Sequence, residues 1–281
     1  MIGFMDIKKL GTIGFVVLVL GMLMMRTSYA RSNLTRDVGF ENGLNGIEIN
    51  ADYKSGLTIT NSVSYYGGKS VKIERPNGKN RVELSDSHSG RAPLHKTVWY
   101  GWSLRVDKND NSGRLIVSQI HHHQGSNRDN QWSQTANFIV RHQDGKFSLK
   151  HGYQSNHPRH TRKDNYRELG EGKLGKWYDF VVQVKWTWRS DGFIKMWKNG
   201  KLVYEHHGST YFDYGSKTKG PYWKAGAYTE TRPALVYVDE YRMGNSSATY
   251  KDVAPSRSTA DKVLKAPSNL SVIAIPSSQI K

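Results

Sequence analysis

The chain has 281 residues, of which 41 are Lys or Arg and 24 are Asp or Glu, so its formal net charge is +17, and it contains no cysteine. The lack of thiols excludes a disulfide scaffold, a cysteine-ligated metal centre and a cysteine nucleophile. Large apolar side chains recur along the chain, which predicts one folded domain with a substantial core. The excess of basic residues predicts a polyanionic partner, because a positive surface potential attracts negative ligands.

The N-terminal segment has the features of a secretory signal. Lys8 and Lys9 precede an apolar run over residues 10–25, and Ser28 and Ala30 supply the small residues that precede signal cleavage. The run is shorter than the roughly 20 residues needed to cross a bilayer, although Arg26 directly after it leaves an uncleaved anchor open as an alternative. We therefore expect a signal peptide over residues 1–30 and a secreted or periplasmic monomer with no membrane contact after cleavage. The expected partner is an anionic polysaccharide and not nucleic acid.

The rest of the chain alternates apolar and polar residues in short segments typical of β-strands. Examples are residues 70–74, 97–106, 115–121 and 180–188, which are rich in Val, Ile, Tyr and Trp. Residues 192–204 predict a hairpin, with Asn199-Gly200 in a type I′ turn whose two central residues need positive φ. Many strands without helical periodicity predict an all-β fold, a two-sheet antiparallel sandwich.

Two stretches break the alternation, and the C-terminus has a different composition. Residues 124–134 form a polar segment, and residues 151–176 form a longer basic one that includes Arg159 and Arg162, so we expect loops at both places. The basic segment has two interpretations, a solvated charge cluster or a rim that grips an anionic chain. Residues 253–281 are rich in Ser, Pro and Lys and predict a tail beyond a domain spanning residues 31–252.

Three strand-like segments place polar residues two positions apart. Because side chains alternate along a strand, each of these pairs lies on one face. Burying such a face without partners is unfavourable, so we expect it to form an open, wet groove. The residues are Arg81 and Glu83, Gln119 and His121, and Tyr222, Lys224 and Tyr228.

The three motifs in this order, RVEL, QIH and YWKAGAY, resemble the signature strands of the β-jelly-roll polysaccharide lyases. These include the family 7 alginate lyases and, in looser form, glucuronan lyases and heparin lyase I. The segments WYDFVVQVKW and VDEYRMG make the chain most similar to the glucuronan lyase and heparin lyase I group, over roughly residues 37–250. Ser85 and Glu230 depart from the alginate lyase pattern, which has Arg and Gln there. The resemblance implies a β-jelly-roll with a concave substrate groove and lyase chemistry.

The same residue types suit β-elimination from a 4-linked uronate. Removal of the C5 proton requires neutralisation of the adjacent carboxylate, and Arg81, Gln119 and His121 can donate hydrogen bonds that strengthen as negative charge builds up. Tyr228 is the candidate catalytic base and acid, because nearby cations would favour its phenolate. His121 becomes the base if the proton and the leaving group lie on opposite faces of the sugar.

The other polar residues of the three motifs have expected supporting roles in substrate binding. We expect Glu83 to orient Arg81 or Lys224 by an ion pair, and Lys224 and Tyr222 to contact substrate. All of these residues should converge on one face, with His121 and Tyr228 within about two strand residues, roughly 7 Å, of each other.

Aromatic and histidine residues outside this constellation have weaker signals. Trp132, Trp223 and Tyr153 are candidates for stacking on sugar rings, or alternatively anchors of the core and loops. The run of three histidines at 121–123 does not indicate a metal site, because His122 should point away from its neighbours and no carboxylate is close in sequence. We expect no metal and no cofactor.

Two other functions remain open. A retaining glycoside hydrolase of similar fold needs two carboxylates about 5–5.5 Å apart, and the chain lacks a Glu-x-Asp-x-x-Glu pattern that would supply them. A noncatalytic module that binds acidic carbohydrate needs only a basic groove with aromatic side chains, so the Gln119, His121, Lys224 and Tyr228 set is what favours an enzyme.

Overall fold

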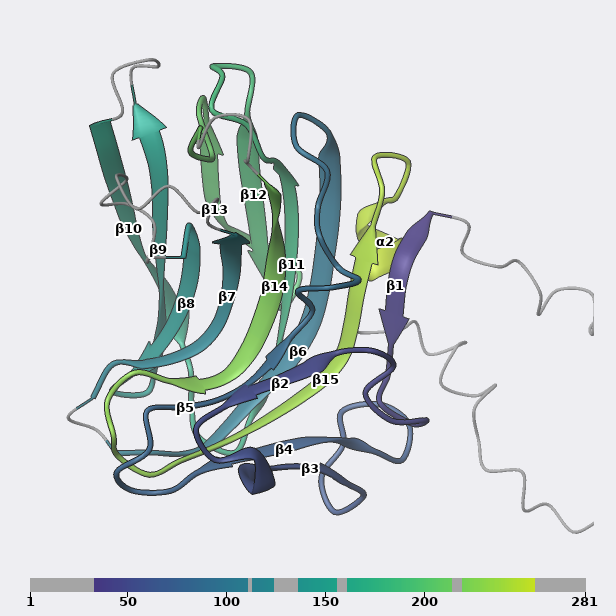
Figure 1. Cartoon of the computed structure of the whole chain (residues 1–281), viewed down its shortest axis with the longest axis vertical. Coiled ribbons are helices and arrows are strands. Elements are labelled where there is room, and N and C mark those ends of the chain that lie inside the picture. The colour runs from purple at the N-terminus through teal and green to yellow at the C-terminus, as the bar shows by residue number, and fades with distance from the viewer. Residues whose placement is uncertain (1–32, 111–112, 124–135, 156–160, 214–218, 256–281) are drawn as a thin grey trace, which may run out of the picture. The chain divides into compact units, whose positions relative to one another are not determined.

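A computed structural model describes residues 33–110, 113–123, 136–155, 161–213 and 219–255. Within these residues the strands form an eight-stranded sheet, with the order β13-β12-β11-β6-β15-β4-β3 and β1 paired to β15, and a seven-stranded sheet, with the order β10-β9-β8-β7-β14-β5-β2 (Figure 1). The strands are β1 (Leu34–Val38), β2 (Glu48–Ala51), β3 (Leu57–Thr60), β4 (Ser70–Arg75), β5 (Arg81–Ser85), β6 (Thr97–Asn109), β7 (Leu115–His123), β8 (Phe138–Gln143), β9 (Lys146–Ser155), β10 (Thr161–Glu171), β11 (Trp177–Lys185), β12 (Phe193–Lys198), β13 (Lys201–His207), β14 (Lys219–Tyr228) and β15 (Ala234–Gly244). Two short helical segments, η1 (Lys54–Gly56) and α2 (Tyr250–Val253), complete the described secondary structure.

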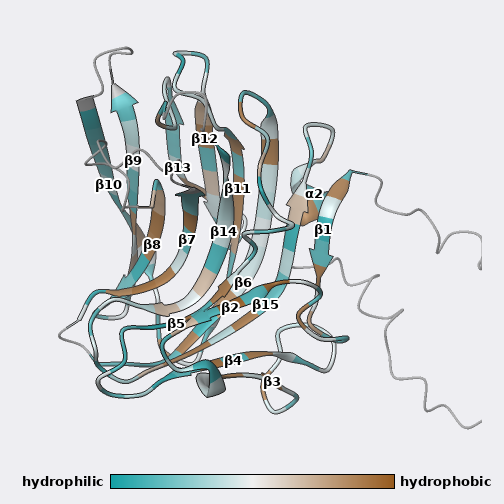
Figure 2. Cartoon of the chain, in the orientation of Figure 1, coloured by the Kyte–Doolittle hydropathy of each residue, from teal (hydrophilic) through white to brown (hydrophobic). Residues whose placement is uncertain are grey.

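Every strand pairing is antiparallel, so the predicted two-sheet antiparallel sandwich is confirmed. Apolar and polar residues alternate along many of its strands (Figure 2). The apolar residues meet between the sheets, where Trp102 of β6 and Trp223 of β14 are fully buried with ring centroids 6.4 Å apart. This packing fixes which side of each strand faces the core.

The predicted hairpin is confirmed at the turn between β12 and β13. Asn199 and Gly200 have φ values of 49° and 80°, the two positive values that a type I′ turn requires. Asn199 also accepts a hydrogen bond through its side-chain oxygen from the backbone N–H of Asp179, at 2.8 Å, which ties the turn to β11.

Most of residues 151–176 form strands rather than the expected loop. The end of β9 and the whole of β10 lie in this segment, and residues 156–160 lie outside the described structure. β10 is the edge strand of its sheet, and charged residues such as Lys163 and Glu168 are exposed on it. Edge strands commonly carry charges that oppose pairing with other chains. This edge position explains why the strand lacks a clear apolar alternation.

The C-terminal end of the described structure packs on the eight-stranded sheet. Val253 and Ala254 are buried in an apolar cluster with Trp99 and Val181. The folded structure therefore continues past residue 252, where we expected the tail to begin, because helix α2 supplies an apolar anchor. Across the described ranges, no helix has the length and apolar character that would carry the chain across a membrane.

Candidate functional site

The three motifs lie side by side on β5, β14 and β7 of the seven-stranded sheet. Arg81 pairs with Tyr228, and Lys224 pairs with both Ser85 and Gln119. Intervening residues such as Trp223 point into the core, so the motif residues share the opposite side of the sheet. We call this side, made by the motif residues and their cross-strand neighbours, the polar face.

Glu83 is the centre of a hydrogen-bonded group on the polar face. Its carboxylate accepts hydrogen bonds from Gln119 Nε2 at 2.5 Å and from Lys224 Nζ at 2.6 Å. Arg81 Nε lies 3.0 Å from the same carboxylate, and Arg81 also donates to Asn50 Oδ1 at 3.3 Å. One carboxylate thus holds a residue from each of the three motifs in a fixed position, which confirms the ion pairs expected for Glu83.

The group has two layers. Glu83, Gln119 and Lys224 are only 1–2% exposed, whereas the Arg81 side chain is 27% exposed. Burial lowers the pKa of Lys224, and the nearby Glu83 carboxylate opposes that shift. The lower layer therefore contains a buried ion pair that positions the residues above it. The expected open, wet face is wrong for Glu83, Gln119 and Lys224, because they satisfy one another's hydrogen bonds and so can be buried.

Tyr228 lies beside Arg81 at one end of the group. The Arg81 guanidinium carbon is 4.0 Å from the centroid of the Tyr228 ring, and the ring also packs on a small apolar cluster that includes Ile116 and Ile139. Gly226, with φ of +150°, precedes it where the strand register shifts, and a Cβ there would clash with the Val82 carbonyl oxygen. Glycine is thus required to let β14 approach β5 and present Tyr228.

His121 lies at the other end, beside Tyr222. Their ring centroids are 5.6 Å apart, and the Arg91 guanidinium carbon is 4.8 Å from the Tyr222 ring. His121 Nδ1 is 2.5 Å from the carbonyl oxygen of His122. Because a carbonyl only accepts, Nδ1 carries the hydrogen and the neutral ring has its lone pair on Nε2. Burial raises the pKa of Tyr222, and Arg91 opposes the shift.

The structure separates His121 from Tyr228 by more than we expected. His121 pairs with Tyr222, whereas Tyr228 pairs with Ile116, five residues earlier on β7. At about 3.3 Å per residue this offset is roughly 16 Å, less any shortening at the register shift, so the expected 7 Å spacing is wrong for the backbone. The reason is that alternation fixes the face of a residue but not its register against a neighbouring strand. A sugar ring placed over Gln119 would lie between the two side chains.

The other predicted site residues, which are not among the polar residues of the three motifs, lie in different environments. Trp223 is fully buried and stacks on Tyr241 with centroids 4.0 Å apart, so it is a core residue and not a sugar platform. Tyr153 packs on His151 and His206. Arg162 is ion-paired with Asp164 at 2.7 Å, and its side chain is 9% exposed. Trp132 and Arg159 lie outside the described residues.

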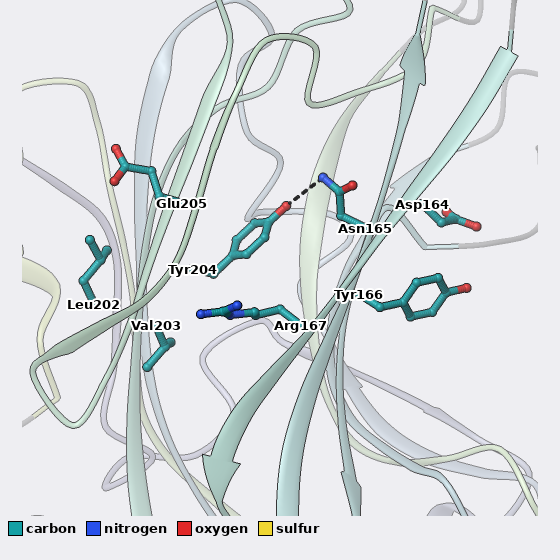
Figure 3. Close-up of a pocket in the computed structure, with 8 residues that line it drawn as sticks. All are labelled: Asp164, Asn165, Tyr166, Arg167, Leu202, Val203, Tyr204 and Glu205. Atoms are coloured by element: carbon teal, nitrogen blue, oxygen red, sulfur yellow. Dashed lines mark hydrogen bonds between the residues drawn. The ribbon is translucent and has the colours of Figure 1, made fainter.

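A cavity lies away from the polar face, between the edge strands β10 and β13 (Figure 3). Asn165, Arg167 and Tyr204 turn into it, whereas Asp164 and Tyr166 point away from it (Figure 3). Asn165 donates to the Tyr204 hydroxyl at 3.2 Å. An inward-pointing charge on an edge strand is a known protection against edge-to-edge association. Arg167 is therefore an inward-pointing charge on the edge strand β10.

Sequence reasoning missed several residues that shape the site. Asn50 contacts Arg81 from β2, Arg91 contacts Tyr222 from a segment bridged to β14, and Ile116 lies under Tyr228. None of these positions has a local signal for function. Only the strand order and register bring them to the motifs.

Comparison with known proteins gives a consistent picture of the fold. A family model described as "Polysaccharide lyase" matches residues 37–242. A solved endo-β-1,4-glucuronan lyase from the fungus Trichoderma reesei superposes with a TM-score of 0.65 at 18% identity, covering 76% of this chain and 96% of that one. The alginate lyase A1-II′ of polysaccharide lyase family 7 gives 0.51 at 21% identity, covering 70% and 86%. The binding domain of Paraclostridial Mosquitocidal Protein 1 gives 0.52 at 12% identity, covering 79% and 51%. No curated protein matches the chain.

Proposed function

Because the chain belongs to the polysaccharide lyase family, we propose that it cleaves a 4-linked, uronate-containing polysaccharide by β-elimination. The products would be a new reducing end and a fragment whose terminal uronate is unsaturated. One observation carries the proposal, which is the buried Glu83 carboxylate that holds Arg81, Gln119 and Lys224 together between Tyr228 and His121.

The chemistry of the reaction calls for such a group of donors. Abstraction of the C5 proton moves charge onto the sugar carboxylate, and donors already in place stabilise that charge without reorganisation. Arg81 is the exposed cation of the group and is our candidate for pairing with the substrate carboxylate. Gln119 has a second amide N–H besides the one it gives to Glu83. Lys224 adds positive potential from the layer below.

Tyr228 and His121 are the proton-transfer candidates on either side of this group. In glucuronate and mannuronate the C5 proton and the O4 leaving group are syn, so Tyr228 can take the proton and return it to O4. In guluronate they are anti, and His121 Nε2 becomes the base while Tyr228 acts as the acid. In both cases the C5–H and C4–O4 bonds break, and the C4=C5 double bond forms.

Glucuronan-like and alginate-like polysaccharides are the two substrate classes that the site residues and the fold similarity support. Similarity in fold to the glucuronan lyase favours the first. Ser85 and Glu230, which replace the Arg and Gln of the alginate lyase pattern, remove contacts expected for alginate. We further propose that the protein acts outside the cytoplasm, as a monomer and without a metal or cofactor.

The test is incubation of purified protein with glucuronan, polymannuronate, polyguluronate, heparin and hyaluronan. The expected result is ultraviolet absorbance from unsaturated ends with at least one of the two proposed substrate classes. Binding to these chains without such absorbance would support a noncatalytic binding protein and refute the proposal. New reducing ends without the absorbance would indicate a hydrolase.

A further inference from the structure

We infer that Arg141 on β8 forms a second carboxylate-binding site of the polar face, occupied by a uronate of the same polysaccharide chain away from the bond that breaks. The inference rests on the proposed function, which it deepens by assigning a binding site beyond the three motifs. The observations that support it are the position of Arg141, the charges around it and the lack of a partner for its guanidinium among the described residues.

Strand register places Arg141 on a line across the sheet with Arg81 and Tyr228. Arg81 pairs with Tyr228, Tyr228 with Ile116, and Ile116 with Arg141. Neighbouring strands are about 4.8 Å apart, so Arg141 lies roughly 10 Å from Tyr228 across the sheet. Since Ile116 and Tyr228 pack together on the polar face, Arg141, which lies directly opposite Ile116, is on that face too. The span fits an oligosaccharide that crosses the strands and not one sugar ring.

The guanidinium of Arg141 is partly buried without an ion pair or hydrogen bond among the described residues. Burial lowers its pKa, and the nearby Arg114 lowers it further. Asp164 is a nearby carboxylate, but it already pairs with Arg162 at 2.7 Å and Lys150 at 3.2 Å. An incoming carboxylate would therefore relieve repulsion between cations instead of displacing an existing partner.

The surroundings of Arg141 also suit a sugar chain. Ile116 lies between Tyr228 and Arg141, and Ile139 lies two residues before Arg141 on β8. The two form an apolar cluster with Tyr228, against which the less polar side of a sugar ring can lie. Farther along, Tyr166 is 65% exposed, and Lys150 Nζ is 5.7 Å from its ring centroid. Tyr166 points away from the cavity at the sandwich edge (Figure 3), in keeping with its register opposite Lys150 on the polar face. Aromatic rings exposed beside cations commonly bind sugars by stacking.

The test compares Arg141→Gln with Arg167→Gln. Both variants lose one positive charge from neighbouring parts of the same sheet, but Arg167 turns into the cavity on the other side (Figure 3). With polymer substrate, we expect Arg141→Gln to raise KM about 10-fold with kcat nearly unchanged, because a charge-assisted hydrogen bond to bound substrate is lost. Arg167→Gln should leave both constants close to wild type. Thermal unfolding of both variants at the wild-type temperature would show that the fold is intact.

Oligosaccharides of increasing length give the decisive measurement. The effect of Arg141→Gln on KM should be absent for the shortest cleaved oligomer and appear when the oligomer is long enough to reach both Tyr228 and Arg141. An effect of equal size at every length, or one equal to that of Arg167→Gln, would overturn the inference.

A binding measurement separates this inference from the lyase proposal. In a Tyr228→Phe background, the Arg141→Gln change should weaken binding of the intact polymer about 10-fold and reduce its salt dependence. Weakened binding, combined with a wild-type protein that forms no unsaturated product from any of the polysaccharides, would support the site at Arg141 while refuting the lyase proposal. Unchanged binding would refute the site at Arg141 alone.

Discussion

Replacement of Glu83 by Gln tests the buried centre of the site. The side chain keeps its shape but loses the charge that pairs with Lys224 at 2.6 Å, where both side chains are at most 2% exposed. Removing one partner of a buried ion pair is destabilising by about 3–5 kcal/mol, because the remaining charge stays buried without compensation. We therefore expect Glu83→Gln to lower the free energy of unfolding by that amount and to reduce activity strongly.

The pH dependence of this loss follows from Lys224. Burial already lowers the pKa of Lys224, and the Glu83 carboxylate opposes the shift, so its removal lowers the pKa further. A lysine whose pKa is lower in the folded than in the unfolded state destabilises the fold while it is charged. The loss of unfolding free energy in Glu83→Gln should consequently become smaller as pH rises toward the ordinary lysine pKa of about 10.4.

The assay is denaturant unfolding of matched variants. Glu74→Gln is the control, because Glu74 pairs with Lys72 at 2.7 Å with side chains 58% and 34% exposed, and exposed pairs contribute at most about 1 kcal/mol. The double variant Glu83→Gln, Lys224→Met should recover much of the stability but not the activity. A loss below about 1 kcal/mol for Glu83→Gln, or a double variant less stable than the single one, would refute the reasoning.

Three further predictions concern Gln119, His121 and His151. Gln119→Ala should lower kcat more than it raises KM in steady-state assays, because its hydrogen bond strengthens as charge builds up; a change in KM alone would contradict this. His121→Ala should abolish product formation from guluronate linkages and only weaken it for glucuronate or mannuronate linkages, and equal loss on both would contradict the assignment of His121 as the anti base. Burial lowers the pKa of His151 to about 3, so the unfolded chain gains a proton near pH 6.5 that the folded chain does not, and stability falls as pH falls. By linkage the free energy of unfolding falls by about 2 kcal/mol between pH 7.5 and pH 5 because of His151. Denaturant unfolding of His151→Gln at both pH values should lack this decrease. A variant whose unfolding free energy changes with pH as much as that of the wild type would contradict the prediction.

The fold and the shared face of the motifs could be predicted because both follow from local alternation. Arg81, Gln119 and Lys224 were each placed correctly on the polar face by their two-residue spacing. Register could not be predicted, since it depends on bulges such as the one near Gly226 and on packing between strands distant in sequence. The separation of His121 from Tyr228 was therefore misjudged.

Burial limited the prediction in a second way. Trp223 was a candidate for sugar stacking, but it lies in the core because it alternates with Lys224 on β14. Arg141 carried no signal at all, because a single arginine in a strand is common and only its register opposite Ile116 brings it near Tyr228. Strand β10 could not be predicted either, because it lies at the edge of its sheet and carries charged residues like those of a loop.

The most direct test of the central claim is the rate of unsaturated product formation by Tyr228→Phe. Phenylalanine keeps the ring that packs on Ile116 and Ile139 and lies beside Arg81, but it removes the hydroxyl assigned to deliver a proton to O4. Loss of such general acid–base catalysis lowers the rate by about 10²–10⁴-fold, and we expect a decrease in this range with unchanged polysaccharide binding and thermal stability. A variant that forms unsaturated product at close to the wild-type rate would contradict the account.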